Sequence, residues 1–184
     1  MIQTSAGPDQ QADSSDPRLI ERFREGEPAA LDEVIERYQL DVTRTVRRLL
    51  GWRGDVEDVV QEVFLAALRR HRTFRGQSSL KTWLIAIAIR RCRSQRRRFW
   101  KSWLLPQREE SPADESIQRD EVAEQVRIAV RKLGTKEREV VVLYYLEELS
   151  VAEVAKILGI SEGAIDVRLH RARKKLKEML SCMN

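Results

Sequence analysis

Apolar residues recur three or four positions apart along most of the chain, which is the spacing of one buried face of an α-helix. Asp16 and Pro17 predict the start of a short helix that ends at Gly26. A second helix is predicted from about Pro28 to Gly51. The chain therefore begins its ordered part as a helical domain.

A third helix is predicted over 56–70, with Asp55 as its cap. One face is apolar and should be buried; its members are Val56, Val59, Val60, Val63, Phe64, Ala67 and Leu68. The opposite face carries Asp58, Gln61, Glu62 and Leu65. Taken alone, that face is a solvated polar surface, since a single exposed leucine needs no explanation.

Residues 74–79 form a predicted polar loop, and either of its last two serines can cap a helix that starts at Leu80. This helix begins with the apolar run 83–89, which taken alone also fits a buried strand, and becomes strongly basic over 90–98. The neighbouring pattern and two alanines favour a helix. Its basic half is either a solvated run of charge or a surface for phosphates, and dense arginines beside a polar loop favour phosphates.

The most informative pattern lies at 149–180. Ser150 and Glu153 predict a capping box, Gly159 suits a left-handed turn, and Ser161 can cap a second helix. The inward stripe of that second helix is Ile165, Leu169, Ala172 and Leu176. Two short helices joined by a glycine turn are typical of a helix-turn-helix motif, whose second helix usually enters the DNA major groove.

The outward face of this second helix is the candidate surface for reading bases. It carries Gly163, Val167, His170 and Lys174, flanked by Asp166 and Arg171. Arg171 can bond a guanine edge, Val167 can contact a thymine methyl, and Asp166 can accept from a cytosine amino group. Lys174 lies toward the distal end of this helix and suits a contact to the phosphate backbone of DNA. The alternative is a solvated amphipathic helix that closes an ordinary bundle.

Two further helices are predicted over 121–133 and 135–146. The apolar positions of the first are Val122, Val126, Ala129, Val130 and Leu133. The strongly apolar segment 140–146 should pack beneath the helix-turn-helix motif. The expected fold class is all-α, with a disordered tail (1–15), two small helical domains (16–99 and 117–184) and a flexible linker (100–116).

Composition agrees with helices and with nucleic acid as a partner. Of the 184 residues, 42% are hydrophobic and 34% are charged. The net charge is only +5, because clusters of basic residues are offset by clusters of acidic residues elsewhere in the chain. The two cysteines, Cys92 and Cys182, are far apart, so neither a structural metal site nor a disulfide framework is expected. No cofactor is predicted. No run of apolar residues reaches the length of a membrane span and no signal peptide is recognisable, so we expect a cytoplasmic protein without membrane insertion.

Three segments in order resemble the extracytoplasmic-function (ECF) group of alternative bacterial sigma factors. DVEDVVQEVF (55–64) resembles their region 2 signature helix, and FRGQSSLKTWL (74–84) resembles the loop and helix that follow. The segment from Leu133 to Leu176, which contains LSVAEVAKILGISEGAIDVRLHRARKKL, resembles region 4. The resemblance extends from about Asp16 to Leu180, and the chain departs from the family pattern at Arg90, Ser94, Gly134 and Asp166.

The resemblance implies a non-enzymatic protein whose partners are core RNA polymerase, promoter DNA and an anti-sigma factor. It implies contacts to the upstream (−35) element by Ser161, Glu162, Gly163, Asp166, Val167, His170, Arg171 and Lys174. It implies contacts to melted bases of the −10 element by Phe74, Arg75, Gly76, Gln77, Ser78, Ser79, Lys81, Arg90 and Arg91. It implies contacts to the polymerase by Asp58, Gln61, Glu62 and Leu65. Trp83 either borders the melted DNA or packs in the core.

Two other classes of protein are alternatives to this one. A two-domain transcriptional regulator that does not join the polymerase shares the helix-turn-helix motif, but its first domain should offer a ligand pocket or a phosphoacceptor aspartate at a strand end. The enzyme alternative lacks support, because GxSxG, GxxxxGKS/T and HExxH are absent and neither His71 nor His170 has an obvious partner in sequence.

Overall fold

A computed structural model describes residues 16–51, 55–101 and 121–182. Within these ranges every regular element is helical, which confirms the predicted all-α class. The predicted tail over 1–15 and the part of the predicted linker after Lys101 lie outside the described residues. No helix in the described part of the chain is both long and apolar enough to cross a bilayer.

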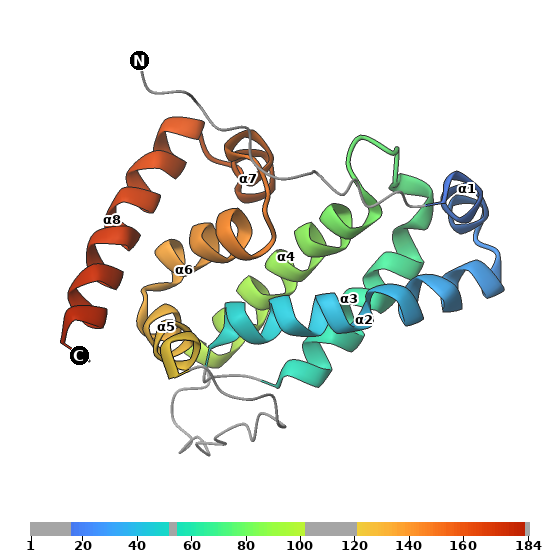
Figure 1. Cartoon of the computed structure of the whole chain (residues 1–184). Helices are drawn as coiled ribbons and strands as arrows, with labels where there is room; N and C mark the ends of the chain where they lie inside the picture. The colour runs from blue at the N-terminus through green and yellow to red at the C-terminus, as the bar shows by residue number, and fades with distance from the viewer. Residues whose placement is uncertain (1–15, 52–54, 102–120, 183–184) are drawn as a thin grey trace.

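The N-terminal half (16–101) consists of four α-helices and one 3₁₀ turn, arranged as Figure 1 shows. They are α1 (Pro17–Glu25), α2 (Pro28–Leu50), α3 (Val56–Arg70), η1 (His71–Thr73) and α4 (Leu80–Lys101). The predicted caps are confirmed: an Asp55 side-chain oxygen accepts from the backbone N–H of Asp58 at 3.1 Å, and Ser79 Oγ accepts from that of Thr82 at 3.0 Å. Gly26, with a φ of 82°, ends α1 in the left-handed conformation that favours glycine.

The apolar run at the start of α4 is helical and buried on almost all sides. Its buried residues are Leu80, Leu84, Ile85, Ile87, Ala88 and Ile89. This broad burial explains why the run lacks an amphipathic pattern: α4 packs against both α2 and α3, and the C-terminal half covers a further side. The helix continues to Lys101, two residues into the predicted linker.

The C-terminal half (121–182) consists of α5 (Glu121–Lys132), α6 (Thr135–Val141), η2 (Val142–Leu146), α7 (Val151–Leu158) and α8 (Glu162–Ser181). The prediction of one α-helix over 135–146 is wrong, because the chain widens at Val142 into a π-helical turn. Val140, Val141, Val142 and Leu143 are buried as expected, but the wider turn directs Tyr145 and Leu146 outward. Val122 and Val126 are also exposed, since they lie on the side of α5 away from the core.

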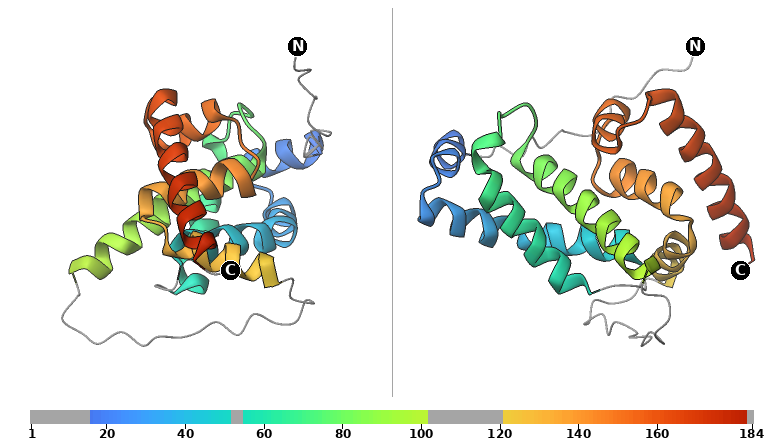
Figure 2. Two further views of the ribbon diagram at one scale, coloured as in Figure 1. Left: turned by 60° about the vertical axis from the view of Figure 1, so that its left-hand side comes forward. Right: turned by 180° about the vertical axis from the view of Figure 1, so that it is seen from behind.

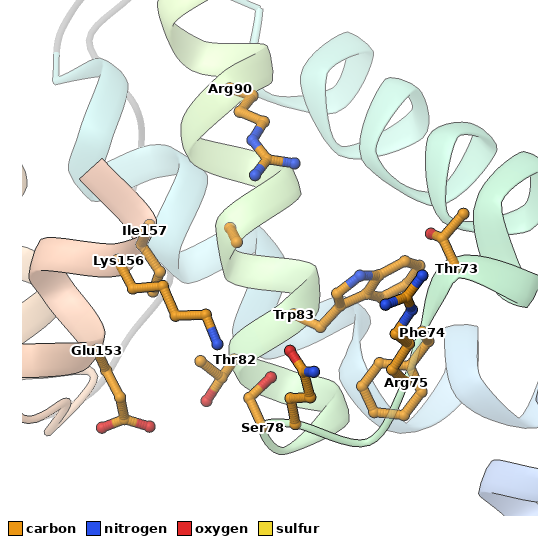
Figure 3. Close-up of a pocket in the computed structure, with 12 residues that line it drawn as sticks. Thr73, Phe74, Arg75, Ser78, Thr82, Trp83, Arg90, Glu153, Lys156 and Ile157 are labelled. Atoms are coloured by element: carbon orange, nitrogen blue, oxygen red, sulfur yellow. The ribbon is translucent and has the colours of Figure 1, made fainter. Parts of the chain in front are cut away.

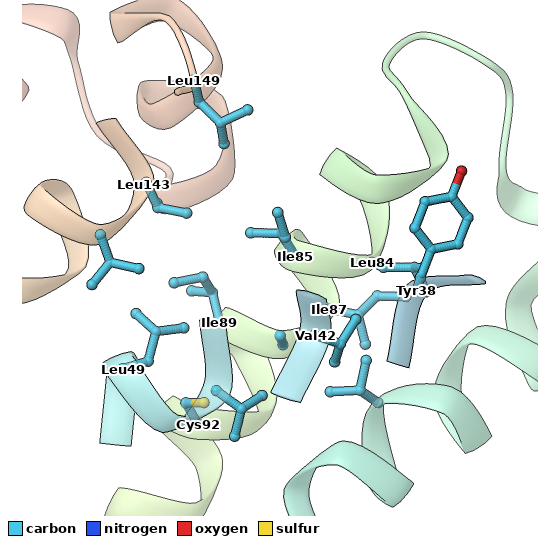
Figure 4. Packing of buried hydrophobic residues seen from close by; sticks show 14 of the residues in the cluster. Tyr38, Val42, Leu49, Leu84, Ile85, Ile87, Ile89, Cys92, Leu143 and Leu149 are labelled. Atoms are coloured by element: carbon cyan, nitrogen blue, oxygen red, sulfur yellow. The ribbon is translucent and has the colours of Figure 1, made fainter. Parts of the chain in front are cut away.

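The two halves pack against each other and share one hydrophobic cluster. The C-terminal half lies beside α4 and the end of α2 (Figure 1 and Figure 2). Leu143 and Leu149 belong to the same buried cluster as Leu49, Ile85 and Ile89, and Figure 4 places them opposite one another. This contact between the halves could not be predicted from the sequence pattern. The apolar residues that form it also belong to the buried core of each half, so their pattern alone does not indicate a second partner.

Independent folding of the two halves stays a prediction. Limited proteolysis should cleave first within 106–116, because that segment has a polar sequence, and should leave two resistant fragments. The fragments should co-elute in gel filtration, since the halves share buried apolar side chains. Simultaneous digestion across both halves would contradict the division into two domains.

Candidate nucleic-acid and polymerase interfaces

The helix-turn-helix motif has the predicted local structure. Ser150 and Glu153 form the capping box, in which Glu153 Oε2 accepts from the backbone N–H of Ser150 at 2.9 Å. Gly159 adopts a left-handed φ of 68° between the two helices. Ser161 caps α8, because its Oγ accepts from the backbone N–H of Ala164 at 3.3 Å. Its side chain therefore already has a structural role at the start of the recognition helix.

The outward face of α8 is free of covering elements in the described part of the chain. Its exposed residues are Glu162, Gly163, Asp166, Val167, His170, Arg171 and Lys174. Val167 is 52% exposed, so its methyl groups are accessible on this face. Behind this face, Arg173 Nε donates to the Tyr145 hydroxyl at 2.7 Å and Lys175 Nζ lies 3.1 Å from Glu137 Oε1. These two contacts hold the flank of α8 against the rest of the half.

The candidate polymerase surface lies on α3, on the side away from the core. Asp58 and Gln61 are exposed, and Leu65 is 51% exposed. Glu62 differs from them, because its carboxylate is 3.1 Å from Arg98 and 3.7 Å from Arg91 of α4. The predicted group of four is thus brought together on one face, with Glu62 tied to the neighbouring helix.

The loop after η1 and the first turns of α4 border a pocket of about 200 Å³, shown in Figure 3. Its lining residues from the N-terminal half are Thr73, Phe74, Arg75, Gln77, Ser78, Thr82, Trp83, Ala86 and Arg90. Trp83 is half-buried, and its ring centroid is 5.4 Å from that of Phe74 and 6.0 Å from that of Phe23. Phe74 is only 1% exposed, so it packs against the indole and offers no free surface to a base.

The opposite wall of this pocket comes from the C-terminal half and could not be predicted from the residue pattern. Glu153, Lys156 and Ile157 of α7 complete the lining, and Figure 3 shows Lys156 extending toward α4. The first helix of the helix-turn-helix motif, α7, therefore lies across the pocket from the loop 74–79, which is predicted to receive a melted base.

The basic half of α4 is not a continuous surface for phosphates. Arg93 and Arg96 both bind the carboxylate of Glu139, which lies on α6 in the other half of the chain. Arg91 is 3.7 Å from Glu62, whereas Arg90 is exposed beside the pocket. The interpretation as phosphate contacts is thus interrupted at four arginines, because Arg98 also contacts Glu62 and a carboxylate takes the place of a phosphate at each of them.

Lys81 also bridges the halves. Its Nζ is 3.7 Å from a carboxylate oxygen of Asp41 and 3.7 Å from one of Glu147. Burial raises the pKa of the Glu147 carboxyl above its ordinary value, while the Thr45 hydroxyl and the charges of Lys81 and Arg48 act in the opposite direction. The charges of Lys81 and Arg48 therefore favour the ionised form of this carboxylate.

Two other observations bear on the chemistry of the site. The Cys92 thiol is buried in α4, and burial raises its pKa to about 12, so it is unreactive at neutral pH. In the ranges that the structure describes, no three His, Cys, Asp or Glu side chains are grouped as a metal site would require.

Family models place the chain in the sigma-70 class, and one of them matches each half. The model described as Sigma-70 region 2 matches residues 34–102, and the one described as Sigma-70, region 4 matches residues 123–176. The chain is 31% identical to the ECF RNA polymerase sigma-E factor of Escherichia coli K12, over 88% of this chain and 92% of that relative. It is 34% identical to the ECF RNA polymerase sigma factor BldN of Streptomyces coelicolor, over 92% of this chain and 68% of that relative.

A solved structure is similar across both halves. The sigma factor RpoE in complex with the anti-sigma factor NepR from Bartonella quintana is 25% identical, with a TM-score of 0.69 over 82% of this chain and 96% of that chain. The chain belongs to the ECF family of RNA polymerase sigma factors.

Proposed function

We propose that this chain binds core RNA polymerase and directs initiation at promoters that carry two separate elements. The proposal rests on two features of one chain: the exposed recognition helix α8, and a pocket at the start of α4 that Trp83 and Arg90 line. One surface suits a duplex, and the other suits an unpaired base. A protein that must both locate and open a promoter needs both.

The exposed face of α8 reads the upstream element in the major groove. Arg171, Val167 and Asp166 contact base edges, because a guanidinium, a methyl-bearing side chain and a carboxylate match guanine, thymine and cytosine respectively. Lys174 lies farther along the helix and contacts the phosphate backbone. Ser161, Glu162, Gly163 and His170 complete this surface.

The pocket beside α4 captures a base of the downstream element. An extruded base exchanges stacking in the duplex for stacking on an aromatic ring, and Trp83 supplies that ring. Gln77 and Ser78 offer hydrogen bonds at its edge, while Arg75 and Arg90 carry the charge that the backbone needs. Gly76, Ser79, Lys81 and Arg91 belong to the same loop and helix and complete the downstream surface. No nucleotide hydrolysis by this chain is required.

Control by an anti-sigma factor is part of the proposal. The similar Bartonella quintana structure contains the anti-sigma factor NepR. A relative with the same two-part fold thus presents a surface that such a protein occupies. We place the protein in the cytoplasm, where the polymerase and the promoters are.

The experiment that tests this function combines the purified chain with core polymerase and genomic DNA, followed by sequencing of transcript starts. We expect starts that share one upstream and one downstream motif and that are absent with core polymerase alone. The same set of starts with and without the chain would refute the proposal.

Charge reversal at Asp58 should weaken binding to core polymerase. Asp58→Lys places a cation in the proposed polymerase surface, and like charges across an interface repel. Glu57→Lys is the matched control, because Glu57 is also an exposed acid in the first turn of α3. A titration of labelled core polymerase should give a raised Kd for Asp58→Lys alone. Equal losses for both variants would assign the effect to net charge, and no loss would exclude Asp58 from the interface.

A further inference from the structure

Three cationic side chains line the pocket at the start of α4 and make no ion pair within the described ranges. They are Arg75, Arg90 and Lys156, and all three are exposed. The lining also contains the carboxylate of Glu153, whose Oε2 accepts from the backbone N–H and the hydroxyl of Ser150 at 2.9 and 2.8 Å. The three cations thus outnumber this one carboxylate, which raises the local concentration of anions. The pocket therefore favours a negatively charged ligand.

The arginines farther along α4 differ from the three cations at the pocket. Most of them contact a carboxylate of the chain, namely Arg91, Arg93, Arg96 and Arg98. A carboxylate makes the same charge-assisted hydrogen bonds to a guanidinium as a phosphate oxygen does. Farther along the helix the chain itself therefore supplies the anion, whereas at the pocket an external anion is needed.

Trp83 and Lys156 lie on opposite sides of the pocket. The indole of Trp83 is half-buried and packs against Phe74 and Phe23, with ring centroids 5.4 and 6.0 Å apart, which fixes its orientation and leaves part of the ring accessible. In Figure 3 the indole lies on one side of α4 and Lys156 approaches from the other, while Arg90 lies farther along the helix. A ligand that uses all three groups has a flat ring at one end and an anion at the other.

The size of the pocket limits the ligand further. Its volume is about 200 Å³, which is below the roughly 300–1,000 Å³ of sites for drug-sized ligands. A single nucleotide meets both conditions, because its base can stack on the indole while Gln77 and Arg75 bond the edge of that base. Its phosphate then lies between Arg90 and Lys156, which supply charge-assisted hydrogen bonds.

We propose that the free chain binds one nucleoside 5′-monophosphate in this pocket, with the base on Trp83 and the phosphate between Arg90 and Lys156. This ligand and an extruded base of the downstream element use the same accessible part of Trp83, so the two compete. The competition rests on the proposed function, whereas binding of the mononucleotide does not. Lys156 distinguishes the two ligands, because it belongs to α7 and is not part of the proposed downstream surface.

Isothermal titration calorimetry of the full chain with AMP tests the proposal without polymerase or promoter, so its failure is distinct from failure of the proposed function. We expect one saturable site per chain. Adenosine, which lacks the phosphate, and inorganic phosphate, which lacks the base, should each bind about tenfold more weakly or worse. Absence of a saturable site, or AMP binding no tighter than either fragment, would overturn the proposal.

Lys156→Gln is the matched variant, and Lys136→Gln is its control. Lys136 is an exposed lysine of α6 outside the pocket lining, so its variant removes the same charge at a different place. Lys156→Gln should raise the Kd for AMP about tenfold and leave the Kd for adenosine unchanged, because adenosine has no phosphate. Lys156→Arg keeps the charge and should restore most of the affinity. Equal losses in the two glutamine variants would make the effect one of net charge and overturn the assigned site.

A trinucleotide of deoxyadenosine distinguishes a free nucleotide from a nucleotide within a strand, since it offers the same base and a phosphate in both. If the pocket of the free chain is a site for a mononucleotide, the trinucleotide should bind no more tightly than AMP in the same calorimetric measurement. A trinucleotide affinity about tenfold or more above that of AMP would assign the pocket to single-stranded DNA alone and overturn the proposal.

Discussion

Replacement of Trp83 by alanine should weaken binding of the assembled holoenzyme to a single-stranded downstream element by about 5- to 150-fold. The physical basis is base stacking on the indole, which is worth about 1–3 kcal/mol per base. Trp83 is half-buried and lines the pocket, so one side of its ring packs in the core while another part is available to a ligand. Fluorescence anisotropy with a labelled oligonucleotide measures the change directly. Binding to a duplex upstream element should remain unaltered.

Two controls separate stacking from stability. Trp83→Phe keeps an aromatic ring and should lose less affinity than the alanine variant. Leu31→Ala removes another half-buried apolar side chain that packs on the same core but lies outside the pocket lining. If Leu31→Ala weakened the downstream complex as much as Trp83→Ala, the role of Trp83 would be structural.

Loss of Arg171 should cost about 1–3 kcal/mol on the preferred upstream element and relax the preference at one base pair. Arg171 is exposed on α8, and a guanidinium there can form two hydrogen bonds to a guanine edge. Binding of the holoenzyme to a randomised duplex library at several salt concentrations gives both the affinity and the base preference of Arg171→Ala.

Lys174→Ala is the matched comparison, since it removes another exposed cation from the same helix. It should weaken all sequences alike and reduce the salt slope by roughly one unit, because a phosphate contact carries no sequence information. A uniform loss of affinity in Arg171→Ala, with an unchanged base preference, would make Arg171 a phosphate contact and our assignment wrong.

Local structure could be predicted from the sequence wherever one residue type determines it. The limits of α3 and α7 follow from their caps, Asp55 and Ser150, and the left-handed turn at Gly159 needs a residue without a Cβ atom. The inward stripe of α8 follows from helical periodicity, and Ile165 is fully buried as that periodicity requires. These signals lie within a few residues of one another, so no tertiary information is needed.

Features that depend on the contact between the halves could not be predicted. Glu139 gave no sign of burial, because glutamate in an amphipathic helix is usually a solvated residue. The arginines that neutralise it are 46 and 43 positions away in the chain. The π-helical turn at η2 could not be predicted either, because the apolar run 140–146 is compatible with an ordinary α-helix. Periodicity identifies a buried face but does not say which partner covers it.

The apolar packing between the halves has a thermal consequence. Burial of Ile85, Ile89, Leu143 and Leu149 in one cluster is driven mainly by entropy near room temperature, with little enthalpy and a large change in heat capacity. Attraction of this kind weakens on cooling. The ion pairs around Glu139 change in the same direction, because the desolvation penalty of charged groups grows as the temperature falls. Cooling therefore weakens both components of the contact. The balance between the two halves is therefore set by temperature as well as by any partner.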